Sequence, residues 1–129
     1  MFNCPEELRY ARTHEWVREE DGLCVIGLTD FAQDALGDIV FINLPQVGDE
    51  LKAEESFADV ESVKAVSDVY APVSGTVSEI NEELLDSPEK INESPYEAWL
   101  IKVTDVTDKG ELMDEADYEA FVEEEKAKE

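Results

Sequence analysis

Glu61-Ser62-Val63-Lys64-Ala65 is the stretch that decides the fold, because it joins two segments with the alternating pattern of β-strands. Ser56–Glu61 precedes it and Val66–Pro72 follows it. Alternation with a period of two is typical of strands that bury one face. Two such segments separated by about four non-alternating residues predict a tight hairpin, with Val63 and Lys64 at the central turn positions.

Lys64 is the only lysine between Lys52 and Lys90. A lysine at a hairpin tip is ordinarily a solvated side chain, since its long stem carries the charge into water. A functional role for Lys64 therefore depends on the rest of the chain.

Further strands are predicted on both sides of the hairpin. Asp21-Gly22 has the composition of a two-residue hairpin turn, and the continuously apolar segment after it predicts an interior strand. The predicted strands are an edge strand at Leu8–Tyr10, then His14–Glu19, Leu23–Leu28, Asp38–Leu44, a short strand after the turn Val47–Leu51, a turn and strand at Val73–Ile80, and Trp99–Val103.

A short helix is predicted between the strands at Leu23–Leu28 and Asp38–Leu44. Asp30 and Gln33 have capping-box spacing, with Thr29 as an alternative cap, and Gly37 is a left-handed stop. The residues expected to share its buried face are Phe31, Ala35 and Leu36.

Two more helices are predicted in the second half of the chain. Ser87-Pro88 predicts the start of a one-turn helix. Asp114 can cap a C-terminal helix whose acidic first turn suits the helix dipole. Its expected packing stripe consists of Met113, Ala116, Ala120 and Phe121.

The predicted fold is mainly β. Similar turn-and-strand segments around Gly48 and Gly75 flank the hairpin, which suggests a small flattened barrel or sandwich with short peripheral helices. We expect one domain over residues 1–129, with flexible ends at 1–7 and 124–129.

The composition limits the partners. The formal net charge of −24 argues against nucleic acid and anionic membranes and favours basic protein partners. The two cysteines, Cys4 and Cys24, lack CxxC spacing, which indicates a reducing compartment, and we expect Cys24 to be a buried thiol. No signal or transit peptide is evident, so we expect a cytoplasmic protein of bacterial or archaeal type rather than a processed mitochondrial form.

The sequence contains no recognisable catalytic constellation. There is one histidine, His14, which we interpret as a structural hydrogen-bonding residue. No nucleophile elbow, phosphate loop or metal-ligand spacing is present. The lysine at the hairpin tip then suggests a different role. A modifying enzyme can reach its amine and attach a carboxylate cofactor, which makes the chain a swinging-arm carrier.

The sequence resembles the glycine cleavage system H proteins, which are lipoyl carriers, from about Leu8 to Phe121. The motifs are specific together and in order. They are Thr13–Val17, Gly27–Gln33, Leu36–Phe41, Leu44–Gly48, Glu61–Ala65, Ser67–Gly75, Ile91-Asn92, Pro95-Tyr96 and Trp99–Lys102.

This resemblance implies a lipoyl/biotinyl-type barrel-sandwich hybrid of antiparallel sheets. It also implies that lipoic acid is attached to Lys64 and that the neighbouring residues Glu61, Ser62, Val63 and Ala65 form the hairpin around it. It implies a non-enzymatic, monomeric carrier, lipoylated by a lipoyl transferase or ligase. The carrier takes an aminomethyl group from glycine decarboxylase (P protein) to aminomethyltransferase (T protein). Dihydrolipoamide dehydrogenase (L protein) then reoxidises the arm.

The resemblance also implies a surface cleft that shelters the loaded arm. A cationic amine there needs carboxylate or hydroxyl partners. Thr13, Glu15 and Asp68 stand at matching positions. The alternative is that Glu15 and Asp68 are ordinary surface acids.

One departure from the family pattern precedes the last strand. Ala98 stands where the family usually has glycine, and the loop Ser94–Ala98 is about one residue short. Two related readings stay open. An H-like protein could relay lipoyl groups or act as a scaffold. A biotin carboxyl carrier is less favoured, because Val63 and Ala65 replace the methionines that usually flank biotinyl-lysine.

Overall fold

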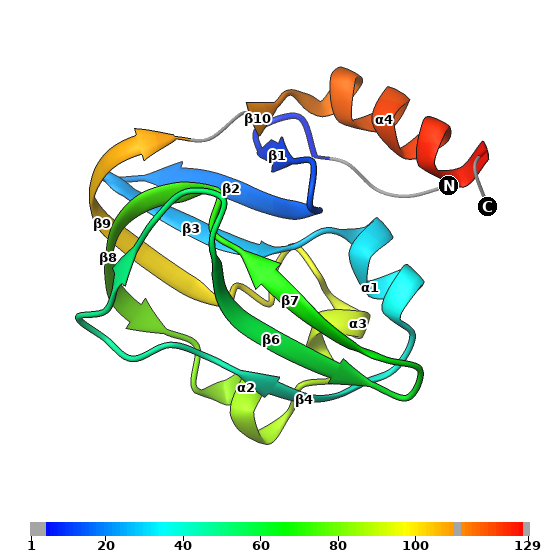
Figure 1. Ribbon diagram of the computed structural model, residues 1–129, viewed down its shortest axis with the longest axis horizontal. Coiled ribbons are helices and arrows are strands. Elements are labelled where there is room, and N and C mark those ends of the chain that lie inside the picture. The colour runs from blue at the N-terminus through cyan, green and yellow to red at the C-terminus, as the bar shows by residue number, and fades with distance from the viewer. Residues whose placement is uncertain (1–4, 110–111, 128–129) are drawn as a thin grey trace.

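The computed structural model describes residues 5–109 and 112–127 and shows two antiparallel sheets (Figure 1). The mainly β fold with short peripheral helices and a C-terminal helix is confirmed. The elements are β1 (Arg9–Ala11), β2 (Glu15–Glu20), β3 (Leu23–Leu28), α1 (Asp30–Leu36), β4 (Ile39–Asn43), β5 (Glu50–Leu51), β6 (Ser56–Ser62), β7 (Val66–Tyr70), β8 (Val73–Ile80), α2 (Glu83–Asp86), α3 (Lys90–Glu93), β9 (Ile101–Lys109), β10 (Leu112–Met113) and α4 (Glu115–Ala127).

The larger sheet has seven strands in the order β10-β1-β2-β3-β9-β8-β5, and the smaller one has three, in the order β4-β6-β7. Side chains from both sheets form the main core, among them Ile26 and Val103 from the larger sheet and Ile42 and Val60 from the smaller. The prediction that β3 is an interior strand is confirmed, because it lies between β2 and β9. The edge prediction for the first strand was wrong, since β10 pairs with β1.

One turn and one glycine within a strand show how local sequence positions these strands. Asp21 and Gly22 both have positive φ, 48° and 81°, as the two-residue turn between β2 and β3 requires. Gly75, which was expected in a turn, instead lies within β8, opposite Leu51. A Cβ at Gly75 would come within 2.6 Å of Val103 Cγ1, so close packing explains this glycine.

The helices differ from the predictions in several details. The hydroxyl of Thr29 accepts the hydrogen bond from Ala32 N–H and caps α1, while Asp30 bonds the Gln33 side chain. Ala32 is buried in place of Ala35, which is exposed. The helix predicted to start at Ser87-Pro88 starts later, at Lys90, and the residue in its cap position is Glu89, which makes no side-chain capping bond. The sequence did not predict α2.

The C-terminal helix packs on a second cluster, on the far side of β1–β3 from the main core. Its buried residues are Tyr118 and Val122. Of the predicted stripe, Met113 and Phe121 do pack against this cluster, whereas the prediction was wrong for Ala116 and Ala120, which are exposed. Asp114 Oδ1 accepts from Asp117 N–H at 2.9 Å, which confirms the predicted cap. The Tyr118 ring stacks on the Tyr10 ring at 4.6 Å between centroids, an aromatic contact that helps to fix α4.

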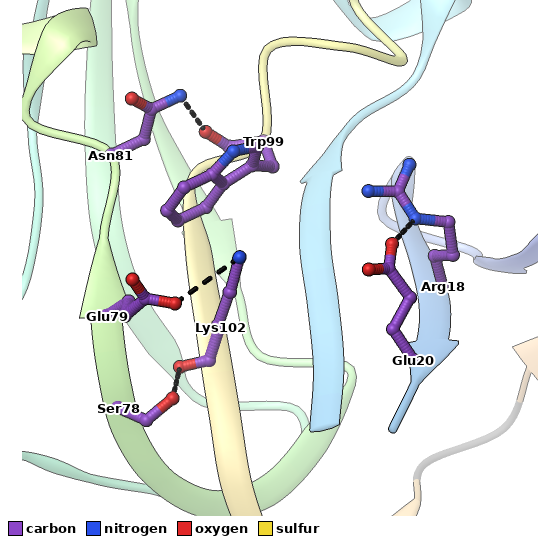
Figure 2. Close-up of polar contacts among 7 residues, drawn as sticks. All are labelled: Arg18, Glu20, Ser78, Glu79, Asn81, Trp99 and Lys102. Atoms are coloured by element: carbon purple, nitrogen blue, oxygen red, sulfur yellow. Dashed lines mark hydrogen bonds and ion pairs between the residues drawn. The ribbon is translucent and has the colours of Figure 1, made fainter. Parts of the chain in front are cut away.

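The last long strand, β9, starts later and runs further than predicted. Its polar second half pairs with the start of β8, where Val73 lies opposite Lys109. Figure 2 shows Lys102 of β9 beside Glu79 of β8, with the Asn81 amide bonded to the carbonyl of Trp99 at 2.8 Å. These contacts join the two strands along one face.

The shortened loop before β9 is closed by backbone hydrogen bonds. Ala98 is buried, and its N–H donates to Ser94 O at 2.9 Å. The carbonyl of Pro95 accepts from the indole N–H of Trp16 at 3.0 Å. The side chain of Ala98, directly before Trp99, is thus accommodated in the hydrophobic core. The predicted flexible ends stay a prediction: residues 1–4 and 128–129, and with them Cys4, lie outside the described residues, while residues 124–127 continue α4.

Candidate functional site: the hairpin lysine and the Thr13–Glu15 cleft

The β6–β7 hairpin places Val63 and Lys64 at its tip, as predicted. Ser62 N–H donates to Ala65 O at 2.8 Å and closes the turn. The hydroxyl of Ser62 accepts from the N–H groups of Lys64 and Ala65, at 3.2 and 3.1 Å. A serine hydroxyl that satisfies two turn amides holds the tip in one shape.

The amine end of Lys64 is available for chemistry. The residue is exposed, and none of the ion pairs among the described residues involves it. Four of the other basic residues are paired with glutamates. Exposure of an unpaired primary amine on an ordered turn suits attachment of a carboxylate cofactor, because a modifying enzyme can close around it without unfolding the chain.

Thr13 and Glu15 lie together at the start of β2. The Thr13 hydroxyl donates to Glu15 Oε1, and Tyr70 N–H donates to Glu15 Oε2 at 3.3 Å. Glu15 is only 1% exposed. Burial raises its pKa from 4.5 to about 7, against the opposing effect of these hydrogen bonds. The carboxyl group can therefore exchange a proton near neutral pH.

A cleft of about 260 Å³ opens beside this pair. Its lining comes from the strand ends of β1 and β7 and from the segment before β6: Ala11, Arg12, Thr13, Glu54, Tyr70, Ala71 and Pro72. The buried Glu15 is not among them, and neither is Asp68. It is an exposed residue of β7 opposite Asp59, between the hairpin tip and Tyr70. The structure thus brings Thr13 and Glu15 together and leaves Asp68 further along the strand. A larger cavity, of about 520 Å³ beside Glu19 and Lys109, includes none of these residues.

The sequence did not suggest Arg12, Glu54 or Tyr70 as cleft residues. Glu54 has a positive φ of 73°, and its N–H donates to Ala71 O at 2.7 Å, which brings it against the end of β7. This contact joins residues that are far apart in the pattern of strands. No local motif could have revealed it.

His14 lies between Thr13 and Glu15 in the chain and has the structural role predicted for it. Its φ is 74°, which is uncommon for a residue other than glycine. Its Nδ1 lies 2.8 Å from the Tyr118 hydroxyl, which in turn lies 2.7 Å from Thr29 Oγ1. Burial lowers the pKa of His14, although Glu125 opposes this effect. These contacts hold Thr13 and Glu15 in place.

Three further features of the described part of the chain concern metal binding, the cysteine thiol and membrane-spanning helices. No group of three His, Cys, Asp or Glu side chains there could hold a metal ion. Cys24 is a buried free thiol, as predicted. No helix among these residues has the length and apolar character needed to cross a membrane.

A sandwich of antiparallel sheets that presents a lysine on a hairpin tip defines a class of cofactor-carrying domains, which includes lipoyl and biotinyl domains. Comparison with known proteins narrows this class. The sequence matches the family described as "Glycine cleavage H-protein" over residues 8–125. The chain belongs to this family.

Relatives and a solved structure agree. The chain is 64% identical over 121 residues to the glycine cleavage system H protein of Lachnoclostridium phytofermentans, covering 93% of this chain and 95% of that protein. It is 56% identical over 124 residues to that of Oceanobacillus iheyensis, covering 94% and 98%. The crystal structure of a glycine cleavage system H protein from Mycobacterium marinum superposes with a TM-score of 0.86 at 41% identity, over 90% of this chain and 96% of that one. The lipoyl-type barrel-sandwich fold is therefore confirmed.

Proposed function

We propose that the chain is the lipoyl carrier of the glycine cleavage system and that lipoic acid is attached to Lys64. The observation that carries the proposal is the exposed Lys64 amine, outside any described ion pair, on a tip ordered by Ser62 in a chain of the H-protein family. The Nζ atom, once deprotonated, displaces the leaving group of an activated lipoyl donor. An N–C bond forms as the bond to the leaving group breaks.

Attached to Lys64, lipoic acid would supply a disulfide whose S–S bond is reduced as one sulfur takes up the aminomethyl group from glycine decarboxylase. Delivery to aminomethyltransferase would leave the dithiol, which dihydrolipoamide dehydrogenase would reoxidise. The residues of this chain supply no catalytic group for these steps. Their part is to present the arm to successive partners at high effective concentration. The net charge of −24 favours basic docking surfaces on those partners. A lipoylating enzyme, a monomeric state and a cytoplasmic location complete the proposal.

Thr13, Glu15 and Asp68 are proposed to shelter the carried amine. The buried Glu15 carboxylate can pair with a cation, and the Thr13 hydroxyl fixes its orientation. Asp68, on β7 between the tip and Tyr70, offers a second carboxylate along the path of the arm. Exclusion of water from a cleft would slow loss of the aminomethyl carbon.

The sheltering role predicts that Glu15→Ala combined with Asp68→Ala will speed loss of the aminomethyl group by about tenfold or more, because each charge-assisted hydrogen bond contributes about 1.5–3 kcal/mol. Formaldehyde release from the loaded, isolated carrier measures it. The matched control combines Glu55→Ala with Asp108→Ala, two exposed acids outside the cleft lining. Unchanged decay in the first double variant would exclude the sheltering role.

A further inference from the structure

The alkyl chain of Lys64 lies against the junction between α1 and β4. A Cβ built on Gly37 would lie 3.3 Å from Lys64 Cε and 3.6 Å from Cδ, so the alkyl stem passes directly over this glycine. Val63 N–H donates to Asp38 O at 3.0 Å. Figure 1 shows the hairpin tip beside the connection from α1 to β4. The tip is therefore fastened to the body of the domain.

Asn92 of α3 holds this junction from the other side. Its amide nitrogen donates to Gly37 O at 2.9 Å and to Gln33 Oε1 at 3.0 Å. Its amide oxygen accepts from Ile39 N–H at 2.9 Å. One side chain thus bonds to three points around the turn that ends α1, and its neighbour Ile91 is fully buried, which anchors α3.

Gly37 has a conformation that other residues avoid, with φ 79° and ψ −159°. This backbone turns the chain sharply out of α1 and presents a surface without a side chain to the lysine stem. Gly22 and Gly48 also have positive φ, but a Cβ at either would meet nothing within 4 Å. Gly37 is thus the one of these three glycines that borders Lys64.

We propose that Gly37 and Asn92 are positioning residues for the modification of Lys64: Asn92 holds Gly37 beneath the hairpin tip, and the lysine stem leaves the tip in one direction over it. This rests on the proposed lipoylation of Lys64. A lipoylating enzyme then meets the amine in a fixed orientation relative to the hairpin, so less motion must be restricted to reach the reacting geometry.

The test compares matched variants of the full chain, produced without lipoate. Asn92→Asp keeps the oxygen that accepts from Ile39 but loses the amide donor to Gly37. Asn81→Asp is its control, because Asn81 is also half-buried and donates to a backbone carbonyl, that of Trp99 (Figure 2). Gly37→Ala is compared with Gly48→Ala. Thermal melts monitored by circular dichroism ensure that all rates are taken on folded protein.

Two rates are measured for each variant. One is the kcat/KM of lipoylation by a lipoate–protein ligase supplied with lipoate and ATP. The other is chemical acylation of Lys64 by a small N-hydroxysuccinimide ester, followed by peptide mapping. We expect Asn92→Asp to lower the enzymatic kcat/KM about tenfold, with chemical acylation unchanged, and both control variants to match the parent. Gly37→Ala, if folded, should show the same pattern.

Equal enzymatic rates for Asn92→Asp and Asn81→Asp would overturn the inference. So would an equal loss of chemical acylation, because the amine would then be less accessible rather than misdirected. Failure of the parent chain itself to accept lipoate would instead overturn the proposed function, which keeps the two claims separate.

Discussion

The hairpin tip and the Thr13–Glu15 segment place their candidate functional side chains in opposite environments, one exposed and the other buried. At the tip, Lys64 is exposed and the turn is ordered by the hydroxyl of its neighbour Ser62. At the start of β2, Glu15 is buried and accepts from Tyr70 N–H of β7, while the adjacent His14 contacts Tyr118 of α4. A modification site must be reachable by an enzyme, whereas a sheltering site must exclude water. The first can be built from adjacent residues, and the second requires packing between distant ones.

The largest effect is expected from removal of the lysine amine at the tip. Lys64→Arg keeps the positive charge but is not a substrate for amide formation with lipoate, so lipoylation and glycine turnover should both be lost. Intact mass and glycine–bicarbonate exchange with the partner enzymes measure the two. Lys52→Arg, at another exposed lysine, should retain both. Residual lipoylation of the Lys64→Arg chain would show that lipoic acid is attached to a different residue.

The next effect concerns Glu15 and depends on pH. Since burial raises its pKa from 4.5 to about 7, the folded chain keeps a proton that the unfolded chain releases. This contribution to stability is fully present below pH 4.5 and is lost as the pH rises through 7, by about 3 kcal/mol. Glu15→Gln stays neutral and should therefore gain stability relative to the parent between pH 4 and pH 8.

Urea unfolding at several pH values measures this difference, with the exposed Glu55→Gln as the control. A gain that does not vary with pH would show that Glu15 titrates near its ordinary value. The contrast between a buried Glu15 with a raised pKa and an exposed Lys64 would then no longer hold.

The sequence predicted the hairpin region better than the Thr13–Glu15 region, because the first is formed by residues close in sequence and the second by residues far apart. The hairpin, its central Val63 and Lys64, and the Asp21-Gly22 turn were predicted because alternation and turn chemistry are local properties. Of the residues named by family resemblance, Thr13 and Glu15 do come together, and Thr13 lines the cleft. Arg12, Glu54 and Tyr70 were missed, because only the packing of β1, β6 and β7 brings them to one place.

The C-terminal helix shows the same limit. Its apolar residues Ala116 and Ala120 suggested a packing face, but they are exposed. Tyr118 is buried instead, since its ring stacks on Tyr10 and its hydroxyl finds His14 and Thr29. A periodic pattern of small residues carries no information about such polar partners. The length of β9 was likewise decided by its pairing with β8 rather than by its own polar residues.

A moderate effect is expected from Tyr118→Phe, which removes the hydroxyl that bonds His14 and Thr29. We expect a loss of about 1–2 kcal/mol in unfolding free energy, because buried polar atoms lose a partner. The His14 ring signals in NMR spectra should also shift. Tyr10→Phe removes the hydroxyl that donates to Pro5 O and should leave those signals in place. Unchanged His14 signals in Tyr118→Phe would contradict the contact between the Tyr118 hydroxyl of α4 and the His14 ring beside the cleft.

The smallest effect is expected from Ser62→Ala at the tip. The two turn amides lose their acceptor but remain open to water, so the cost should be about 0.5–1 kcal/mol. Faster hydrogen exchange at the amides of Lys64 and Ala65 would report the loosened turn. Ser78→Ala, which removes a hydroxyl bonded to Lys102 O on β9, is the control and should leave the tip unchanged. Unaltered exchange at the tip would mean that Ser62 is not what orders it.

The central claim is that Lys64 carries a lipoyl group. Its most direct test is intact mass spectrometry with peptide mapping on protein purified from its native host. The account predicts a single lipoyl adduct on the peptide that contains Lys64. An unmodified Lys64 in cells that make lipoate, or a biotinyl adduct in its place, would contradict it.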